Sequence, residues 1–369
     1  MRIAFDSSIW DPEIRAPLRQ TLRAWYHSYG RVLPWRQTRD PYAIWVSEIM
    51  LQQTQVKTVL PYYQRWVESL PTLLDLAQAH RDQVLKLWEG LGYYRRAHNL
   101  HRAAQWIVEQ HQGSFPTQFE QVVALPGIGR TTAGGILSAA FDQPWAIMDG
   151  NVKRVLARLG ALPVPPAKAL PQLWQLSETL LDPDYPRDFN QALMDLGATL
   201  CRRRDPDCDK CPWQTHCCAY NQGRVEQLPM KEPSSPRPHK VIAVAVVFRG
   251  HELLIDQRLE TSMLGGLWEF PGGKIEPGES PADCVVREVK EEIGIDVTAE
   301  AELATIEHEY THFTITLIAH ICRYQSGEAR PLQCADVRWI PPDHLKDYAF
   351  PMANQKLFPY LQQWLQLNN

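Results

Sequence analysis

The chain of 369 residues and 42.4 kDa is longer than one typical hydrophobic core can organise, so its length predicts two domains. Its 44% apolar content is that of a globular protein, but no apolar run approaches the roughly 18 residues of a membrane span and its start lacks a secretion signal, so we expect a cytoplasmic protein without membrane contact. The net charge of −4 is uneven: residues 1–222 hold 24 basic and 21 acidic side chains, whereas residues 223–369 hold 14 and 21, which makes the first part better suited to bind nucleic acid.

The first predicted helix runs from Pro12 to Tyr29, where apolar residues recur at helical spacing, and it ends at Gly30. The loop that follows, from Arg31 to Arg36, places two arginines around a Pro-Trp step. Such a loop either packs its aromatic ring while the arginines stay in solvent, or it contacts the bases or phosphates of nucleic acid.

The second predicted helix, from Tyr42 to Leu51, is mostly apolar but contains Glu48 beside positions that should face a core. Desolvation would raise the pKa of this carboxyl group and make it a general acid near neutral pH. The alternative is a solvated glutamate, which is the more common situation on a helix.

A later helix carries a basic stripe, which consists of Arg95, Arg96, His98 and His101. This stripe either faces the phosphates of nucleic acid or is an ordinary solvated helix face. Both alternatives place the four side chains at the surface.

A helix, a tight glycine turn and a second helix are predicted around Gly127 and Gly129. The first helix ends at Leu125 and the second covers Thr131 to Phe141. Backbone amides at such a turn can bind a phosphate oxygen without help from side chains. Asp149 follows at the start of another helix, so a carboxylate is held near this surface, although alone it would be an ordinary N-cap.

Further helices are predicted from 170 to 181 and from 189 to 200, and a cluster of thiols follows them. The thiols are Cys201, Cys208, Cys211 and Cys217, which are separated by six, two and five residues. A cytoplasmic chain would not use them for disulfides, so they predict a metal site, for which zinc is the generic occupant, and the alternative is four free thiols. Cys218 adjoins the last ligand and could replace it. Three arginines, 202–204, would form a basic loop between the first two ligands.

The C-terminal region begins after a linker at residues 223–240 that contains four prolines. Strands are predicted from Val241 to Phe248 and from Leu253 to Asp256. A glycine loop that contains Gly272 then leads into a helix with carboxylates on one face, namely Glu288, Glu291 and Glu292. Three unpaired carboxylates repel one another, so a divalent cation such as Mg²⁺ or Mn²⁺ is a candidate ligand.

These motifs together resemble a known family. Residues 125–158 are similar to the helix-hairpin-helix and Gly/Pro-Asp signature of DNA base-excision glycosylases, and the runs SEIMLQQTQVKTVLPYY and LWEGLGYYRRAHNLHRAA resemble the MutY family of adenine glycosylases. The resemblance implies an all-α helix-hairpin-helix domain at residues 1–222 with an iron-sulfur lobe at 201–217. It also implies a proline-rich linker at 223–240 and an α/β Nudix-fold domain with a mixed sheet at 241–369.

The activity that the resemblance implies is removal of adenine from double-stranded DNA where it pairs with 8-oxoguanine or guanine. Glu48 would protonate the flipped adenine, Asp149 would stabilise the cationic sugar, and Asn151 would orient Asp149. Candidate contacts to DNA or lesion are Arg31, Leu51, Gln52, Tyr93, Gly127, Gly129 and Thr131, and in the C-terminal domain Thr311, His312 and Asn354.

Cofactor and rival activities also follow from the resemblance. It implies a [4Fe-4S] cluster on the four cysteines and a monomeric protein. Bifunctional relatives carry a lysine where this chain has Thr131, so we expect base removal without strand cleavage. Most members of the family read 8-oxoguanine with a degraded Nudix box, whereas this chain keeps the box intact. Gln333 stands where MutT-like hydrolases often place a further acid, and we therefore expect a reader of 8-oxoguanine. The alternatives are a Nudix domain that also hydrolyses 8-oxo-dGTP, a bifunctional endonuclease III-like glycosylase/lyase, and a non-catalytic iron-sulfur protein that binds DNA.

Overall fold

The structure is a computed structural model that describes residue 5, residues 11–231 and residues 236–368. The chain forms two compact units, of which the first comprises Met1–Ala77 and Arg102–Ser234 and the second Gln78–His101 and Ser235–Asn369. Helix α6 (Arg95–His111) contains the second boundary. Among the described residues, no helix has both the length and the apolar character needed to cross a bilayer.

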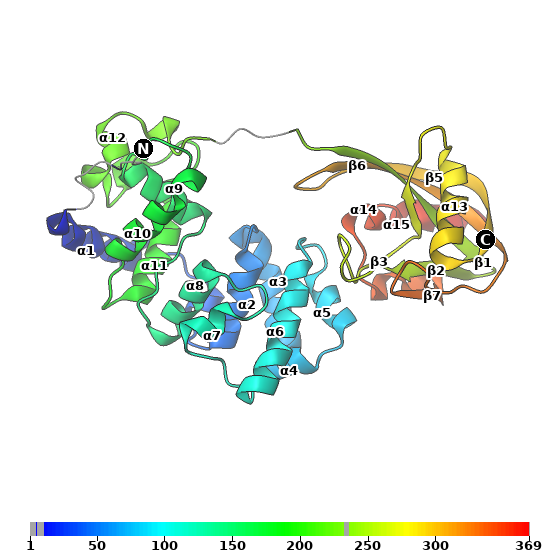
Figure 1. Cartoon of the computed structure of the whole chain (residues 1–369), viewed down its shortest axis with the longest axis horizontal. Coiled ribbons are helices and arrows are strands. Elements are labelled where there is room, and N and C mark those ends of the chain that lie inside the picture. Colours follow the sequence, from blue (N-terminus) through cyan, green and yellow to red (C-terminus); the bar gives the residue numbers. More distant parts are fainter. Residues whose placement is uncertain (1–4, 6–10, 232–235, 369) are drawn as a thin grey trace. The chain divides into compact units, whose positions relative to one another are not determined.

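The first unit is helical (Figure 1). Its elements are α1 (Pro12–Tyr29), the short turn η2 (Pro34–Arg36), α2 (Pro41–Leu51), α3 (Val56–Ser69), α4 (Leu73–Gln78), α7 (Phe119–Val123), α8 (Arg130–Phe141), α9 (Gly150–Leu159), α10 (Leu170–Leu180), α11 (Pro186–Asp195), the π-helical turn η4 (Leu196–Leu200) and α12 (Cys218–Asn221). Capping side chains determine where several of these helices begin. Asp40, for example, caps α2 by accepting hydrogen bonds from the amides of Tyr42 at 3.1 Å and Ala43 at 3.2 Å, and a proline follows at the first helical position.

The helix predicted from 189 to 200 is not one α-helix. Helix α11 ends at Asp195, and the chain continues through η4, in which Gly197 lies against Asn151 at the start of α9. A Cβ on Gly197 would lie 2.6 Å from the Cβ of Asn151, so the wider turn brings bare backbone up to that residue.

The helical core joins α1, α9, α10 and α11. Its buried residues include Leu18, Leu22, Val155, Leu173 and Leu193. This core fixes the start of α9 beside the end of α11, and both ends contribute to the cavity described below.

The second unit contains a mixed sheet, as predicted. Its strands are β1 (His239–Arg249), β2 (Glu252–Gln257), β3 (Trp268–Glu269), β4 (Gly272–Lys274), β5 (Asp296–Glu309), β6 (Thr314–Ser326) and β7 (Asp336–Ile340). The order is β3-β2-β1-β6-β5, with β4 on β1 and β7 on β2, and β1 pairs with β6 in parallel while the other pairs are antiparallel.

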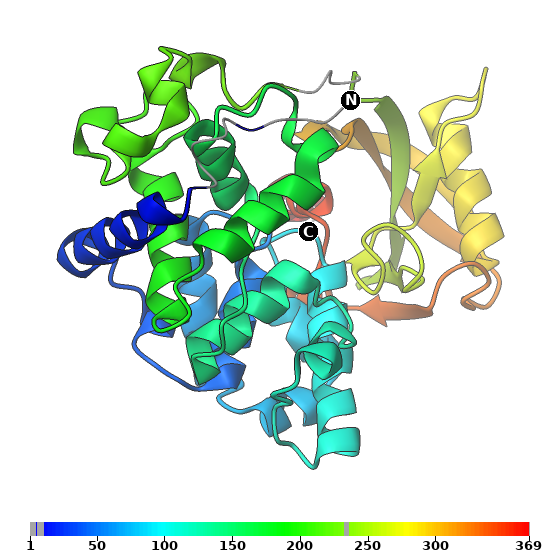
Figure 2. The same ribbon diagram turned by 60° about the vertical axis from the view of Figure 1, so that its left-hand side comes forward.

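Helices cover both faces of this sheet (Figure 1). Alternate residues of β1 point to opposite faces, so Ala243 and Ala245 pack with α13 (Pro281–Ile293) while Val244 and Val246 pack with α14 (Met352–Gln355) and α15 (Phe358–Asn368). Figure 2 shows α13, in yellow, lying along the strands.

The segment Gln78–His101 holds α5 (Arg81–Trp88) and the start of α6, and here the basic-stripe interpretation is wrong for two residues. Arg96 and His101 are buried, each with 8% exposure. The guanidinium of Arg96 donates to the carbonyls of Leu91 at 3.3 Å and Gly92 at 3.1 Å, and burial lowers its pKa to about 10. A side chain that caps backbone carbonyls in this way is structural and does not face solvent.

Candidate active site

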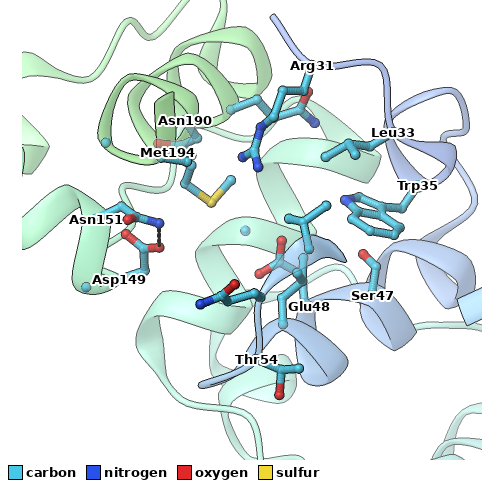
Figure 3. Close-up of a pocket in the computed structure, with 18 of the residues that line it drawn as sticks. Arg31, Leu33, Trp35, Ser47, Glu48, Thr54, Asp149, Asn151, Asn190 and Met194 are labelled. Carbon is cyan, nitrogen blue, oxygen red and sulfur yellow. Dashed lines mark hydrogen bonds between the residues drawn. The ribbon is translucent and has the colours of Figure 1, made fainter. Parts of the chain in front are cut away.

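A cavity of about 760 Å³ lies in the helical unit, between the end of α2, the start of α9 and the end of α11. Figure 3 shows Glu48 and Asp149 entering it from different helices. Its lining includes Arg31, Leu33, Trp35, Arg36, Glu48, Leu51, Gly135, Asp149, Asn151, Arg154, Asn190, Gln191 and Met194. Both predicted catalytic acids therefore share one cavity although 101 positions separate them in the chain.

Glu48 rests directly on the backbone of α8. A Cβ on Gly135 would lie 2.8 Å from its Oε2 atom, so the absence of a side chain there leaves room for the carboxyl group. The residue keeps some exposure to the cavity, but protein surrounds the carboxyl group closely. Burial, and then the nearby charge of Asp149, raises the pKa of Glu48 to about 7, while Arg36 lowers it.

Asp149 is both an N-cap and a cavity residue. Its Oδ1 accepts from the amide of Val152 at 2.7 Å, and its Oδ2 accepts from Asn151 Nδ2 at 3.1 Å. Burial raises the pKa of Asp149, although these hydrogen bonds oppose the rise. Asp149 can therefore be an N-cap and a residue of the site at once, because the hydrogen bond from the amide of Val152 to Oδ1 fixes the direction in which Oδ2 points.

Asn151 is held from the other side by Arg154. The Nη2 of Arg154 donates to Asn151 Oδ1 at 2.9 Å and to the carbonyl of Gly197 at 2.6 Å, and its Nε donates to the carbonyl of Cys201 at 2.8 Å. Asn151 therefore has a fixed amide orientation, with its nitrogen toward Asp149. The same contacts tie the start of α9 to the first cysteine.

Sequence reasoning missed one buried acid, Asp195 at the end of α11. It pairs with both Arg31 and Arg36, whose guanidinium groups line the cavity. The sequence feature that could have revealed Asp195 is that it is the only carboxylate among the mostly apolar residues 189–200. Arg31 thus lies at the cavity as predicted for a binding residue, but its charge is partly engaged by protein.

The hairpin residues lie together at the start of α8. Gly127 has φ of +79°, a conformation that favours glycine, and its carbonyl accepts from Gln52 Nε2 at 3.4 Å. Gln52 also donates to Thr132 Oγ1 at 3.2 Å. Gly129 precedes the first residue of α8, Thr131 lies in its first turn, and Leu51 lines the cavity.

The predicted lesion contacts of the second unit fall into two groups. The rings of Tyr93 and His312 lie edge to face with centroids 6.2 Å apart, and Thr311 is exposed on the same loop as His312. Asn354 is instead buried, with 5% exposure, and its Oδ1 accepts from the amide of Phe270 at 3.1 Å.

The carboxylates of α13 are not all unpaired, which corrects the premise of the cation prediction. Arg287 donates to Glu288 at 2.9 Å and to Glu291 at 3.4 Å. Glu292 accepts from the amide of Gly272 at 3.3 Å, and burial, with Glu269 and Glu288, raises its pKa to about 7.

Asp256 on β2 is a second acid that sequence reasoning missed. It lies opposite Glu269 of β3 and is 1% exposed, and its Oδ1 has no hydrogen-bond partner. Burial, followed by the charges of Glu269 and Glu292, raises its pKa. Across the described part of the chain, no three or more His, Cys, Asp or Glu side chains form a group already arranged to hold a metal ion.

The four cysteines nevertheless line one small cavity of about 30 Å³, together with Arg158, Asp207, Gln214 and the less polar Leu200, Tyr220 and Val225. Arg158 Nη1 donates to Cys201 Sγ at 3.4 Å. Burial raises the pKa of Cys211 to about 12 and of Cys217 to about 11, so these thiols stay protonated at neutral pH unless a metal displaces the protons. Cys218 does not line this cavity and packs with Ala219 and Leu228, in a cluster that Cys217 also contacts. Among the described residues, the four thiols thus line one cavity beside a cation, but they are not gathered into a preformed metal site.

Comparisons with known proteins identify relatives of both parts of the chain. Residues 46–178 match the family profile described as "HhH-GPD superfamily base excision DNA repair protein", and residues 243–360 match that of the NUDIX domain. The adenine DNA glycosylase of Rattus norvegicus is 35% identical over 92% of this chain and 77% of its own length, and that of Homo sapiens is 34% identical over 93% and 74%. Among solved structures, a thermostable thymine-DNA glycosylase is 30% identical, covers 57% of this chain and 98% of its own, and has a TM-score of 0.53.

Proposed function

Because this chain belongs to the adenine DNA glycosylase family, we propose that it hydrolyses the N-glycosidic bond of adenine paired with 8-oxoguanine or guanine in double-stranded DNA. The observation that carries this proposal is the cavity shared by Glu48 and Asp149. A flipped nucleotide needs one group that protonates the base and one that stabilises the sugar cation. Glu48 has a pKa raised to about 7, which suits the first task, and Asp149 is oriented by two hydrogen bonds, which suits the second.

Glu48 is the proton donor. With a pKa of about 7, a substantial fraction of it carries a proton at neutral pH, whereas an exposed glutamate would be almost fully ionised. Protonation of a ring nitrogen lets adenine leave as a neutral base when the bond to the sugar breaks.

Asp149 stabilises the positive charge that develops on the sugar. Its orientation depends on Val152 and Asn151, so little reorganisation is needed when the charge appears. Thr131 cannot form a Schiff base, so water completes the reaction without strand cleavage.

The remaining parts support this activity. Cys201, Cys208, Cys211 and Cys217 would hold a [4Fe-4S] cluster, which would stabilise the lobe from residue 201 to 217. Thr311 and His312 of the C-terminal Nudix domain, together with Tyr93 of the segment Gln78–His101, read 8-oxoguanine. We retain the boundaries 1–222, 223–240 and 241–369 for the domains, and a cytoplasmic location on DNA.

The test is an adenine-release assay with alkali-developed cleavage on three duplexes, with adenine opposite 8-oxoguanine, guanine or cytosine. We expect release from the first two and little from the third. Glu48→Gln should abolish most of the activity, whereas Glu68→Gln, which changes an exposed acid on α3, should not. Binding of the mismatched duplex without any release of adenine would refute the proposal in favour of a non-catalytic DNA-binding protein.

A second candidate activity, pyrophosphate release from 8-oxo-dGTP, is favoured by Asp256 and Glu292, two acids within electrostatic reach in the Nudix domain. Glu288 and Glu291 each form an ion pair with Arg287. Pyrophosphate release with Mg²⁺ or Mn²⁺ that disappears in Glu292→Gln would establish this activity, and its absence would leave the reader role.

A further inference from the structure

The segment Gln78–His101 belongs to the second unit and is fastened to the rest of that unit at three places. At the start of α5, Arg81 Nη2 donates to Gln257 Oε1 at 2.7 Å. In the first turn of α6, His98 Nε2 lies 2.8 Å from the carbonyl oxygen of Gly265. The third place is the end of α5.

Glu89 accepts the hydrogen bonds at the end of α5. Its Oε1 accepts from the backbone amide of Phe350 at 2.9 Å and from Gln355 Nε2 at 2.7 Å. Its Oε2 accepts from Lys86 Nζ at 2.6 Å, and Lys86 Nζ also donates to the carbonyl of Tyr348 at 3.0 Å. The Glu89 side chain is only 18% exposed, so water competes weakly for these bonds. One carboxylate therefore ties α5 to α14 and to the loop before α14.

A tightly bonded turn connects Glu89 to Tyr93. The carbonyl of Gly92 accepts from Trp88 Nε1 at 3.1 Å and from Arg96 Nη2 at 3.1 Å, so the turn is held from both flanking helices. Tyr93 itself has φ of +50°, in the left-handed region that residues other than glycine rarely adopt. Such a backbone persists only where its surroundings hold it in place. The position of Tyr93 thus depends on how the end of α5 is anchored.

The ring of Tyr93 meets His312 from the turn between β5 and β6, edge to face, with the ring centroids 6.2 Å apart. The segment Gln78–His101 supplies one of these rings and the sheet supplies the other. 8-Oxoguanine differs from guanine only in the oxygen on C8 and the proton on N7. A site that distinguishes two such similar bases must hold its contacts to within about 0.5 Å.

We propose that Glu89 is a specificity-determining positioning residue, which fixes Tyr93 beside His312 so that the protein distinguishes 8-oxoguanine from guanine opposite adenine. This inference rests on the proposed function, in which Tyr93 and His312 read the lesion. Glu48 and Asp149 belong to the first unit. Loss of the Glu89 contacts therefore leaves the reacting groups in place and changes the choice between the two mispairs.

The experiment compares full-length Glu89→Ala and Glu89→Gln with the parent protein. Alanine removes both acceptor oxygens, whereas glutamine keeps one that can accept from the Phe350 amide. Gln355→Ala removes one of the donors to Glu89 and is the second test if Glu89→Ala does not fold. The matched control is Glu300→Ala, which removes a carboxylate that pairs with Arg323 at 2.6 Å across β5 and β6.

Three quantities are measured for each variant. The first is the rate constant of adenine release, below saturating protein, from duplexes with adenine opposite 8-oxoguanine or guanine. The second is the Kd for the same duplexes with 2′-fluoro-deoxyadenosine, from which the base is not released because fluorine destabilises the sugar cation. The third is hydrogen exchange of the peptides 89–94 and 348–355 in the DNA-free protein.

We expect Glu89→Ala to lose about tenfold of the preference for 8-oxoguanine, in both rate and Kd, because one hydrogen bond to a charged group can supply this factor. Release opposite guanine should stay unchanged, and both peptides should exchange faster. Glu89→Gln should keep most of the preference, Gln355→Ala should lose part of it, and Glu300→Ala should keep all of it.

The positioning role would be overturned by an equal loss on both duplexes, by an unchanged preference in folded Glu89→Ala, or by unchanged exchange of both peptides. A parent protein without any preference for 8-oxoguanine would overturn it as well. The proposed function fails separately, if the parent binds the 8-oxoguanine duplex more tightly but releases no adenine. Loss of that binding preference in Glu89→Ala would then still uphold the positioning role.

Discussion

Replacement of Asp149 by asparagine isolates the charge of this residue from its structural task. Asparagine has the same shape and caps a helix as well as aspartate does, so the bond to the amide of Val152 can remain. What is lost is the negative charge. Asn151 directs its Nδ2 at Asp149, and Arg154 holds the Oδ1 of Asn151. An asparagine at position 149 would therefore have to turn its amide group so that its oxygen, and not its nitrogen, faces the Nδ2 of Asn151.

The magnitude follows from the environment of the carboxylate. A group that is largely buried and pre-oriented toward a developing cation contributes on the order of 3 to 4 kcal/mol to transition-state stabilisation, and each 1.36 kcal/mol changes the rate about tenfold. Asp149→Asn should therefore slow single-turnover release of adenine by hundreds-fold or more. The loss should appear in the rate at saturating protein and not in DNA affinity.

The matched control is Asp11→Asn, because Asp11 also caps a helix, accepting from the amide of Glu13 at 2.9 Å, but does not line the cavity. Both variants should unfold within about 1 kcal/mol of the parent protein. Release of adenine by Asp149→Asn at close to the parent rate would show that the reaction does not depend on this charge.

Three further predictions follow from the same contacts. The pKa of Glu48, about 7 in the folded protein, lies above its unfolded value, so its ionisation disfavours folding progressively as pH rises from about 4.5 to 7. Glu48→Gln should therefore add about 2 to 3 kcal/mol to the free energy of unfolding by urea at pH 8 and little at pH 4. Equal effects at both pH values would contradict this prediction. Because Thr131 replaces the lysine of bifunctional enzymes, borohydride should trap no covalent adduct on abasic DNA, and a trapped adduct would support the lyase alternative. Cys211→Ala should lower the bound iron and sulfide and the melting temperature, whereas Cys218→Ala, outside the thiol cavity, should keep the iron content; the reverse pattern would reassign the ligand.

Sequence pattern alone predicted much of the architecture. Helical spacing identified α1, because short-range periodicity reflects burial of one helix face. The apolar run with Glu48 identified α2, which is buried along most of its length. Two strands and the helix after the glycine loop were predicted from their own residues, whereas the mixed sheet was implied by the resemblance to the Nudix fold. Family resemblance then assigned Glu48 and Asp149, which the fold brings to one cavity.

Only the tertiary structure decided which charges are paired. Arg31 and Asp195 lie 164 positions apart, and no local pattern relates them. Arg96 looked like a surface cation but caps carbonyls in the interior, and Asp256 looked like the end of a strand but is a buried acid. Periodicity records whether a side chain faces a core, but the identity of its partner depends on which distant segment packs there, and this is fixed only when the helices and strands assemble.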